Sequence, residues 1–218
     1  GPSDFYGLLI DLYAGQTDKF YFDQPAGTGF ESFATSADGS GNWLIVANET
    51  DQDDGLHYSR SNDNGTTFTP FTQAGGYGTP AIAAADEGEF LVVHYRPSGA
   101  PGGPQKGSPL VSEALYARTY DMETDTWGSP QLIAGGFNSP DVIELKRTGD
   151  DRFLVAWTNA AGYNGTGLDY DIFYSISTNG GQDWSAAALL NEWGDTDTDT
   201  DHDLSPSVSS DSSGNTMA

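Results

Sequence analysis

The sequence is built from a unit that recurs along the chain. In each copy a strand-like segment leads through a turn into an aromatic residue and then into aliphatic residues. The copies read FATSADGSGNWLIVAN from Phe33, PAIAAADEGEFLVVHY from Pro80 and PDVIELKRTGDDRFLVAW from Pro140. A fourth copy, PSVSSDSSGNTMA, starts at Pro206. Internal repeats of this length are typical of solenoids and propellers, and they constrain the fold more than any single motif does.

Each unit continues into a second pair of strands. GLHYSRSNDNGTTFTPF, EALYARTYDMETDTWGSPQL and DIFYSISTNGGQDWSAAAL each read as a strand, a tight loop and another strand. A meander of four short strands cannot bury both faces of its own sheet, but sheets stacked around a common axis bury each other. We therefore expect an all-β fold, a β-propeller of four-stranded antiparallel blades.

The two ends of the chain indicate how such a ring could close. Residues 7–25 read as the third and fourth strands of a unit, while the C-terminal copy supplies the first strand and the start of the second. Joined, they would form one composite blade and hide the sheet edges. The alternative is a piece of a larger ring. The expected single domain, 1–218, has units 31–75, 76–135 and 136–193, and a partial unit 204–218 plus 5–27.

Charge and composition exclude several classes of partner. The chain has 8 Lys and Arg against 32 Asp and Glu, a net charge of −24, which repels nucleic acid and anionic membrane surfaces. No apolar run approaches the roughly 20 residues that membrane insertion as a spanning helix requires. Without cysteine, disulfides and thiolate metal sites are excluded. We find no sustained apolar pattern at helical spacing, which favours strands and turns.

Two eight-residue loops share the pattern Ser-x-Asp/Asn-x-Gly-x-x-aromatic. They are SNDNGTTF at residues 61–68 and STNGGQDW at 177–184, each between strand-like runs. The pattern resembles the Asp-box, or BNR repeat, of the sialidase-like β-propellers, with Phe for Trp in the first loop and Asn for Asp in the second. TYDMETDTW at 119–127 is a degenerate copy, and DLYAGQTDKF at 11–20 is weaker still. The resemblance covers most of the chain and implies a propeller.

We interpret these loops as structural fasteners. An Asp or Asn in a turn accepts hydrogen bonds from backbone N–H groups of its own loop, and Gly permits positive φ. The serine hydroxyl joins this network, and the aromatic ring folds against a neighbouring strand. The resemblance implies that the loops lie at the blade periphery, away from the central site. The fastening residues are Ser61, Asp63, Gly65 and Phe68, and Ser177, Asn179, Gly181 and Trp184.

The resemblance also raises the question of a sialidase site. Sialidases hold a substrate carboxylate with three arginines and use a Tyr–Glu pair as nucleophile and an Asp as acid/base, and their Arg-Ile-Pro segment is absent here. Arg147 and Arg152 fall in an acidic turn and are expected to form exposed salt bridges. Arg60 and Arg118 are expected to face solvent. Arg96, which follows an apolar strand, is a weak candidate for ligand binding.

No catalytic residue is predicted. Tyr58, Tyr116 and Tyr174 read as the same position in successive units, which indicates packing instead of a unique nucleophile. His57 and His94 lie in strand-like runs and lack the spacing of a metal site or a catalytic triad. On these grounds the sequence favours a binding role over catalysis.

The segment DTDTDTDHD is the sharpest feature outside the repeat. Aspartates that alternate with small residues put several carboxylates within reach of one centre, and Ca²⁺ accepts six to eight oxygen ligands in irregular geometry. An acidic, solvated linker is the alternative. Weaker candidates are DQDDG at 51–55 and the pair Asp169 and Asp171. The predicted calcium ligands are Asp195, Asp197, Asp199, Asp201 and Asp203.

Three functions are compatible with these observations. The first is a non-catalytic BNR-repeat module of a secreted or cell-surface protein that binds a glycan or a protein and is stabilised by calcium. The second is a sialidase-like glycoside hydrolase of the exo-α-sialidase type, or a fragment of one. The third is a structural subunit that forms a homo-oligomer through open blade edges. The extracellular location is implied by the resemblance of residues 189–215 to bacterial BNR-repeat surface proteins.

Overall fold

The computed structural model describes ten stretches of the chain, and every element in them is a strand. For the first two stretches only the backbone is described. The described residues contain no helix that could span a membrane. The stretches are 6–11, 16–21, 29–49, 55–96, 113–136, 140, 142–159, 170–190, 203–211 and 215–218.

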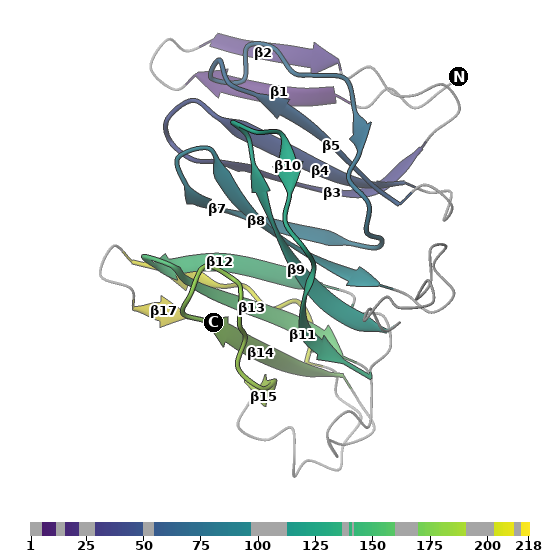
Figure 1. Ribbon diagram of the computed structural model, residues 1–218, viewed down its shortest axis with the longest axis vertical. Coiled ribbons are helices and arrows are strands. Elements are labelled where there is room, and N and C mark those ends of the chain that lie inside the picture. Colours follow the sequence, from purple (N-terminus) through teal and green to yellow (C-terminus); the bar gives the residue numbers. More distant parts are fainter. Residues whose placement is uncertain are drawn as a thin grey trace.

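Three antiparallel sheets form the body of the protein, and two strand pairs flank them (Figure 1). The first blade is β3 (Phe30–Ala37), β4 (Trp43–Glu49), β5 (Leu56–Ser61) and β6 (Thr72–Gln73). The second is β7 (Pro80–Asp86), β8 (Glu89–Arg96) and β9 (Ala114–Asp121), with β10 (Thr126–Trp127) and β11 (Gln131–Gly135) both paired to β9. The third is β12 (Ile143–Gly149), β13 (Arg152–Asn159), β14 (Asp171–Ser177) and β15 (Ala188–Leu189). The flanking pairs are β1 (Tyr6–Asp11) with β2 (Gln16–Tyr21), and β16 (Ser209–Ser210) with β17 (Thr216–Met217).

The blades are stacked through their first strands. β3 contacts β7, β7 contacts β12, and β12 contacts β16, so the first strands follow one another in chain order. Sheets arranged in this way radiate from a common line, which is the geometry of a β-propeller. The predicted fold class, all-β with four-stranded antiparallel blades, is confirmed.

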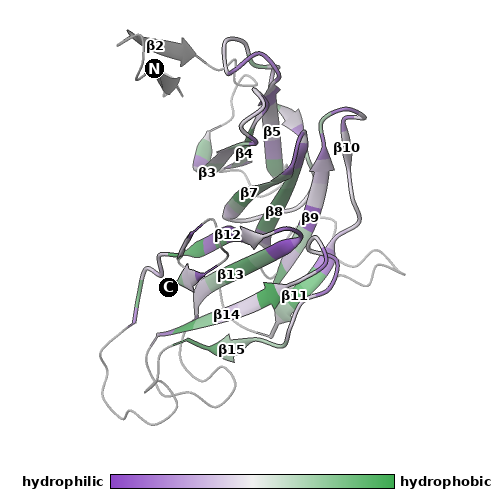
Figure 2. Cartoon of the chain, turned by 90° about the vertical axis from the view of Figure 1, so that its left-hand side faces the viewer, coloured by the Kyte–Doolittle hydropathy of each residue, from purple (hydrophilic) through white to green (hydrophobic). Residues whose placement is uncertain are grey.

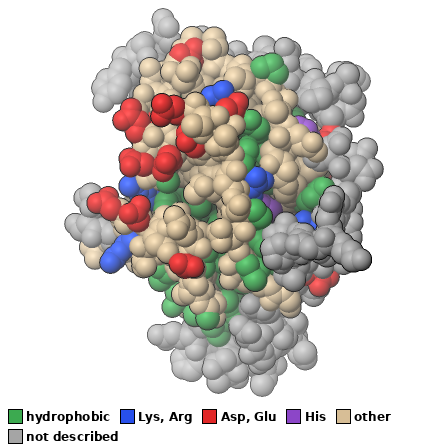
Figure 3. All heavy atoms as spheres, in the orientation of Figure 1, with side chains coloured by type: hydrophobic (Ala, Val, Ile, Leu, Met, Phe, Trp, Pro, Cys, Tyr) green, Lys and Arg blue, Asp and Glu red, His purple; other side chains and the backbone are tan. Residues whose placement is uncertain are grey.

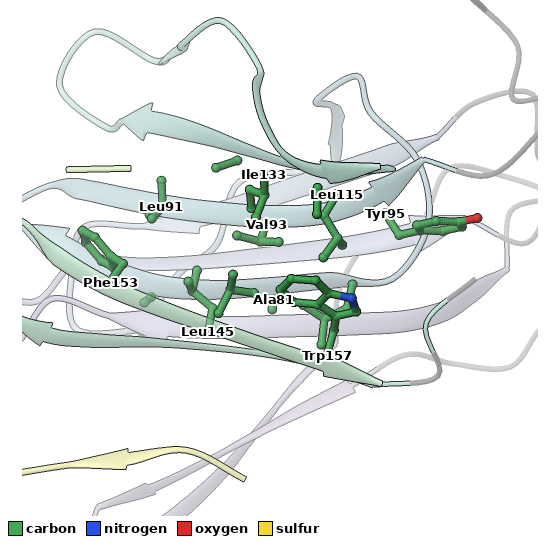
Figure 4. Close-up of a cluster of buried hydrophobic side chains, with 14 of the residues drawn as sticks. Ala81, Leu91, Val93, Tyr95, Leu115, Ile133, Leu145, Phe153 and Trp157 are labelled. Carbon is green, nitrogen blue, oxygen red and sulfur yellow. The ribbon is translucent and has the colours of Figure 1, made fainter. Parts of the chain in front are cut away.

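The second blade is buried on both of its faces. Successive residues of β8 point to opposite sides, as a strand requires. Phe90 and Val92 pack against the first blade, whereas Leu91 and Val93 pack against the third, and all four side chains are fully buried. Figure 4 shows the second of these contacts, where Leu91 and Val93 meet side chains that include Phe153. The apolar colouring of β8 in Figure 2 agrees with this double burial.

The C-terminal strand pair begins as the first blade does. In the turn between β3 and β4, Asp38 accepts hydrogen bonds from the backbone N–H and the side-chain amide of Asn42, at 3.2 and 2.7 Å. Asp211 accepts the same two bonds from Asn215, at 2.9 and 2.8 Å. The β1–β2 and β16–β17 pairs are separate sheets, and Figure 1 draws β1 and β2 at the top and β17 beside the third blade. A composite blade, like self-association through open edges, therefore stays a prediction.

An aspartate joins the first two blades. The Asp125 carboxylate accepts hydrogen bonds from the hydroxyls of Tyr58 and Tyr120, at 2.9 and 2.6 Å, and from the Arg60 guanidinium at 3.1 Å. Arg60 also donates to the Met122 carbonyl at 2.9 Å. The bond from Tyr120 is the main reason why the pKa of Asp125 is lowered. Since Tyr58 and Arg60 belong to β5 while the other residues belong to the second blade, this cluster ties the two sheets together.

The expectation that Arg60 and Arg118 face solvent was wrong. Arg60 lies opposite Leu44 in the pairing with β4, while Arg118 lies opposite Val92 in the pairing with β8. Arg60 pairs with the first residue after Trp43, whereas Arg118 pairs with the second residue after Phe90, so the two arginines differ by one position. Arg118 therefore points to the opposite face of its sheet. Both arginines reach into the same inter-blade contact, where Arg118 donates to the carbonyls of Ala74 and Gly75 at 2.8 and 3.0 Å.

Truncating Asp125 should loosen this contact. Asp125→Ala leaves the two phenolic hydroxyls without their acceptor, so we expect the free energy of unfolding to fall by about 1–3 kcal/mol. Urea denaturation followed by tryptophan fluorescence measures the change. Asp150→Ala is the matched control because Asp150 forms only an exposed, 3.7 Å ion pair with Arg147, and such pairs contribute about 1 kcal/mol at most. Equal stability of D125A and the wild type would contradict the assignment.

Candidate functional site

The first fastening loop satisfies its own polar groups. The Ser61 hydroxyl donates to Asp63 Oδ1 at 2.7 Å and accepts from the Gly65 N–H at 3.0 Å. The Asp63 carboxylate also accepts from the backbone N–H and the hydroxyl of Thr67, at 2.9 and 2.7 Å. Gly65 has φ of 78°, and Phe68 packs beside the buried Ile45. The hydrogen bonds lie within the loop, as a fastener requires.

The second loop repeats this arrangement with Asn in place of Asp. Ser177 donates to Asn179 Oδ1 at 3.1 Å and accepts from the Gly181 N–H at 2.9 Å. Asn179 accepts from the Asp183 N–H at 2.9 Å, and its amide donates to the Asp183 carboxylate at 2.8 Å. The Trp184 indole donates to the Gly181 carbonyl at 3.0 Å.

The two loops occupy corresponding places. Ser61 pairs with Trp43, and Ser177 pairs with Phe153, the aromatic residue that begins the same run of the third blade. In the second blade the position of the serine is taken by Tyr120, opposite Phe90. We name this side of the blades, where the loops and the turns after the first strands lie, the box end. Figure 3 shows acidic side chains gathered on that side, at the left.

The opposite side, where the second strands finish, carries buried polar residues. Glu49, Arg96 and Asn159 are the last residues of β4, β8 and β13, and each lies six residues after the aromatic residue of its blade. Their exposed fractions are 3%, 5% and 1%. Three successive blades therefore bury a carboxylate, a guanidinium and an amide at one equivalent position. We name this side the polar end.

Arg96 is held over an aromatic ring. Its guanidinium carbon lies 5.7 Å from the centre of the Tyr77 ring, in the range of a cation–π contact. Its Nη2 atom is buried without a hydrogen-bond partner. Two residues earlier on the same face, His94 Nδ1 lies 3.2 Å from the Tyr77 carbonyl, while His94 Nε2 is buried without a partner. Burial, and then the charges of Arg118 and Arg96, lowers the pKa of His94 to about 4, so the imidazole is neutral near pH 7.

A glycine-rich connection fixes this part of the polar end. Residues 74–79 link the first blade to the second, and Gly76 and Gly78 have φ of 104° and 79°. A Cβ on Gly78 would lie 2.3 Å from the Tyr95 carbonyl, so no other residue fits there. The Gly78 N–H donates to the Asn48 side chain at 3.1 Å. The connection therefore runs tightly across the contact between the blades and carries Tyr77 to Arg96.

Buried polar pairs lie at the polar end of the other two blades. In the first blade, His57 Nδ1 lies 3.8 Å from Glu49 Oε2. In the third, Asn159 pairs with Asp171 across β13 and β14, and both residues are 1% exposed. Neither Oδ1 nor Nδ2 of Asn159 has a hydrogen-bond partner. A buried amide without partners is costly, so it marks a position that a ligand, ion or water could complete.

The pairing of strands corrects one expectation about the tyrosines. Tyr58 pairs with Val46 and Tyr174 with Ala156, which are equivalent positions. Tyr116 instead pairs with His94, one position further along its strand. Tyr116 was therefore wrongly aligned with the other two. It is 2% exposed, so its role in packing holds.

The predicted calcium ligands lie mostly outside the described residues. Asp195, Asp197, Asp199 and Asp201 are among the positions for which no structure is described. Asp203 is exposed, and its backbone N–H donates to the Tyr170 carbonyl at 2.9 Å, directly before Asp171. No group of three or more His, Cys, Asp or Glu side chains that could hold a metal occurs in the part of the chain that the structure covers. Calcium binding by the acidic segment stays a prediction.

Comparison with known proteins supports the fold. No family model and no curated protein matches the sequence. A protein of unknown function from Dyadobacter fermentans superposes with a TM-score of 0.59 at 16% identity, covering 81% of this chain and 46% of that one. The α-L-arabinanase of Penicillium chrysogenum, complexed with arabinobiose, superposes with a TM-score of 0.57 at 12% identity, covering 88% and 56%. The chain thus spans about half the length of these structures, and at such identities the similarity establishes the fold alone.

The sequence reading missed most of the polar end. It singled out Arg96 but neither Glu49 nor Asn159, because no motif surrounds them. The three residues could have been found from the repeat, because each lies six residues after the aromatic residue of its unit, Trp43, Phe90 or Phe153.

Replacing Asp63 by asparagine should remove a pH dependence. Hydrogen bonds from the Thr67 N–H, and then from the Ser61 and Thr67 hydroxyls, lower the pKa of Asp63 to about 2. Because this value lies below that of the unfolded chain, the stabilisation is complete above pH about 4 and is lost as the pH falls toward 2.

In Asp63→Asn the amide does not titrate, so stability should fall less steeply over this window while the loop keeps the bonding seen at Asn179. Urea denaturation at a series of pH values measures the slope. Asp150→Asn, an exposed carboxylate, is the control. A slope unchanged from the wild type would show that Asp63 is not fastened as described.

Proposed function

We propose that this chain is a non-catalytic, glycan-binding β-propeller module of a secreted or cell-surface protein, and that the sugar binds at the polar end. The observation that carries this proposal is Arg96, which is 5% exposed and whose Nη2 atom has no hydrogen-bond partner. A buried charged donor without an acceptor costs free energy. A hydroxyl or ring oxygen of a bound sugar would supply that acceptor.

The equivalent positions favour a neutral sugar. Glu49 and Asn159 add an acceptor and an amide at the same level of the neighbouring blades, and sugar hydroxyls both donate and accept hydrogen bonds. The net charge of −24 disfavours anionic ligands. The structurally similar arabinanase was solved with a neutral disaccharide, arabinobiose. The secreted or surface location rests on the resemblance of residues 189–215 to bacterial BNR-repeat surface proteins.

Arabinobiose and longer arabino-oligosaccharides are the first ligands to test by isothermal titration calorimetry. Sialyllactose serves as the anionic comparison. Arg96→Gln should weaken binding at least tenfold, since it removes the buried charged donor but retains an amide. Arg152→Gln is the control because Arg152 is exposed and lies at the box end. Thermal melting checks that R96Q is folded. Sugar binding that survives in folded R96Q would refute the location.

A glycoside hydrolase is the second candidate, favoured by two buried carboxylates. Glu49 and Asp171, which are 3% and 1% exposed, lie at the polar end of the first and third blades. Most glycosidases act with two carboxyl groups that flank the scissile bond. Against this reading, the described residues offer one arginine at the polar end, Arg96, where the resembled sialidases use three.

We expect no hydrolysis of 4-nitrophenyl α-L-arabinofuranoside or of a fluorogenic sialoside by this chain. Both assays should give the rate of buffer alone. Activity that disappears in Glu49→Gln or Asp171→Asn, with unchanged melting temperature, would establish the hydrolase instead of the binding module.

A further inference from the structure

The apolar contact between the second and third blades has polar side chains at one of its ends. Along this contact the side chains are apolar until Tyr95 on β8 and Trp157 on β13, which Figure 4 shows at one end of the cluster, opposite Leu91 and Phe153. The Tyr95 hydroxyl points out of the cluster toward the polar end (Figure 4). The polar residues beyond these two rings form this end of the contact.

The third blade contributes a carboxylate and an amide at this place. Asn159 and Asp171 are cross-strand partners, so their side chains project to the same face of the sheet. They share that face with Trp157 and Phe173, which pack against the second blade. Both polar residues are 1% exposed, and the Asn159 amide has no hydrogen-bond partner at either atom.

The second blade contributes Glu113. Its backbone is fixed on both sides, because its N–H donates to the Arg96 carbonyl at 2.7 Å and its carbonyl accepts from the Gly136 N–H at 3.0 Å. Burial, and then the negative charge of Glu113, raises the pKa of Tyr95. Leu115 is the cross-strand partner of Tyr95, and Glu113 lies two residues before Leu115, so Glu113 is at the same end of the contact as the Tyr95 phenol.

We propose that this place binds a divalent cation of the Ca²⁺ type, with Asp171 and Asn159 Oδ1 as ligands from the third blade and Glu113 as a ligand from the second. Carboxylate and amide oxygens suit a hard cation that accepts irregular geometry. The cation would coordinate the unpartnered Asn159 oxygen, and the Asn159 N–H₂ would donate to a water ligand of the ion. A cation held by both sheets would lock the second and third blades together. The site shares Asn159 with the proposed sugar-binding end, but calcium binding is measured without sugar, and the site differs from the acidic segment 195–203.

Calcium titration of the full chain, stripped with EDTA, tests the proposal. We expect heat of binding by calorimetry and a rise in melting temperature with Ca²⁺. Asn159→Ala and Asp171→Asn should each weaken affinity at least tenfold, and Glu113→Gln should weaken it less. Glu123→Gln is the control, since Glu123 is exposed in a loop at the box end. N159A keeps both carboxylates, so it separates loss of a ligand from loss of charge if D171N does not fold.

Terbium gives a second readout that depends on position. Tb³⁺ bound here lies close to Trp157, two residues before Asn159, so excitation of tryptophan should give terbium emission that N159A reduces and Ca²⁺ displaces. A variant with Asp195, Asp197, Asp199 and Asp201 all changed to Asn separates this site from the acidic segment. Binding kept in that variant and lost in N159A supports the proposal. Binding unaffected by N159A and D171N, or no binding by the wild type, overturns it.

Discussion

Burial of both faces of each sheet is the constraint on which the rest of this structure depends. A four-stranded blade with apolar residues on both sides is stable only between two other sheets, and β8 meets this condition with Phe90 and Val92 on one face and Leu91 and Val93 on the other. The stacking fixes the spacing of the blades, so equivalent residues recur at equivalent places. It also fills the contact between the second and third blades with apolar side chains.

The polar groups at the box end and at the polar end differ in how far their hydrogen-bonding capacity is satisfied. At the box end the groups satisfy each other, since Ser61 and Asp63 bond within one loop and Asp125 gathers hydroxyls and a guanidinium from two blades. At the polar end Arg96 and Asn159 retain buried atoms without partners. A group that is satisfied has no use for a ligand, whereas a buried, unsatisfied one gains free energy when a ligand arrives. Function is therefore expected where the fastening is incomplete.

The sequence predicted the architecture because repetition and strand periodicity are local signals. The pattern of residues 61–68 specified both the turn and its hydrogen bonds, down to the exchange of Asp63 for Asn179. It failed where a one-residue offset decides the outcome: Arg118 and Tyr116 were aligned by neighbouring residues, but pairing with β8 puts each on the other face of the sheet. The sequence pattern also missed Asn159. The local sequence gives no sign that this amide is buried, because its burial results from the contact between sheets.

The acidic net charge of the chain bears on the buried charged residues of the polar end. A chain with 32 acidic residues against 8 Lys and Arg gains little from adding negative charge to its interior. Yet Asp171 is almost fully buried at the contact between the second and third blades, and Glu113 of the second blade lies at the same end of that contact. A cation bound there, as proposed, would offset part of this negative charge. Arg96 lies on the other face of the second blade, which faces the first blade with His94, so its charge is directed to a different contact. The second blade thus presents a buried cation on one side and a carboxylate on the other, and each side is suited to a ligand of different chemistry.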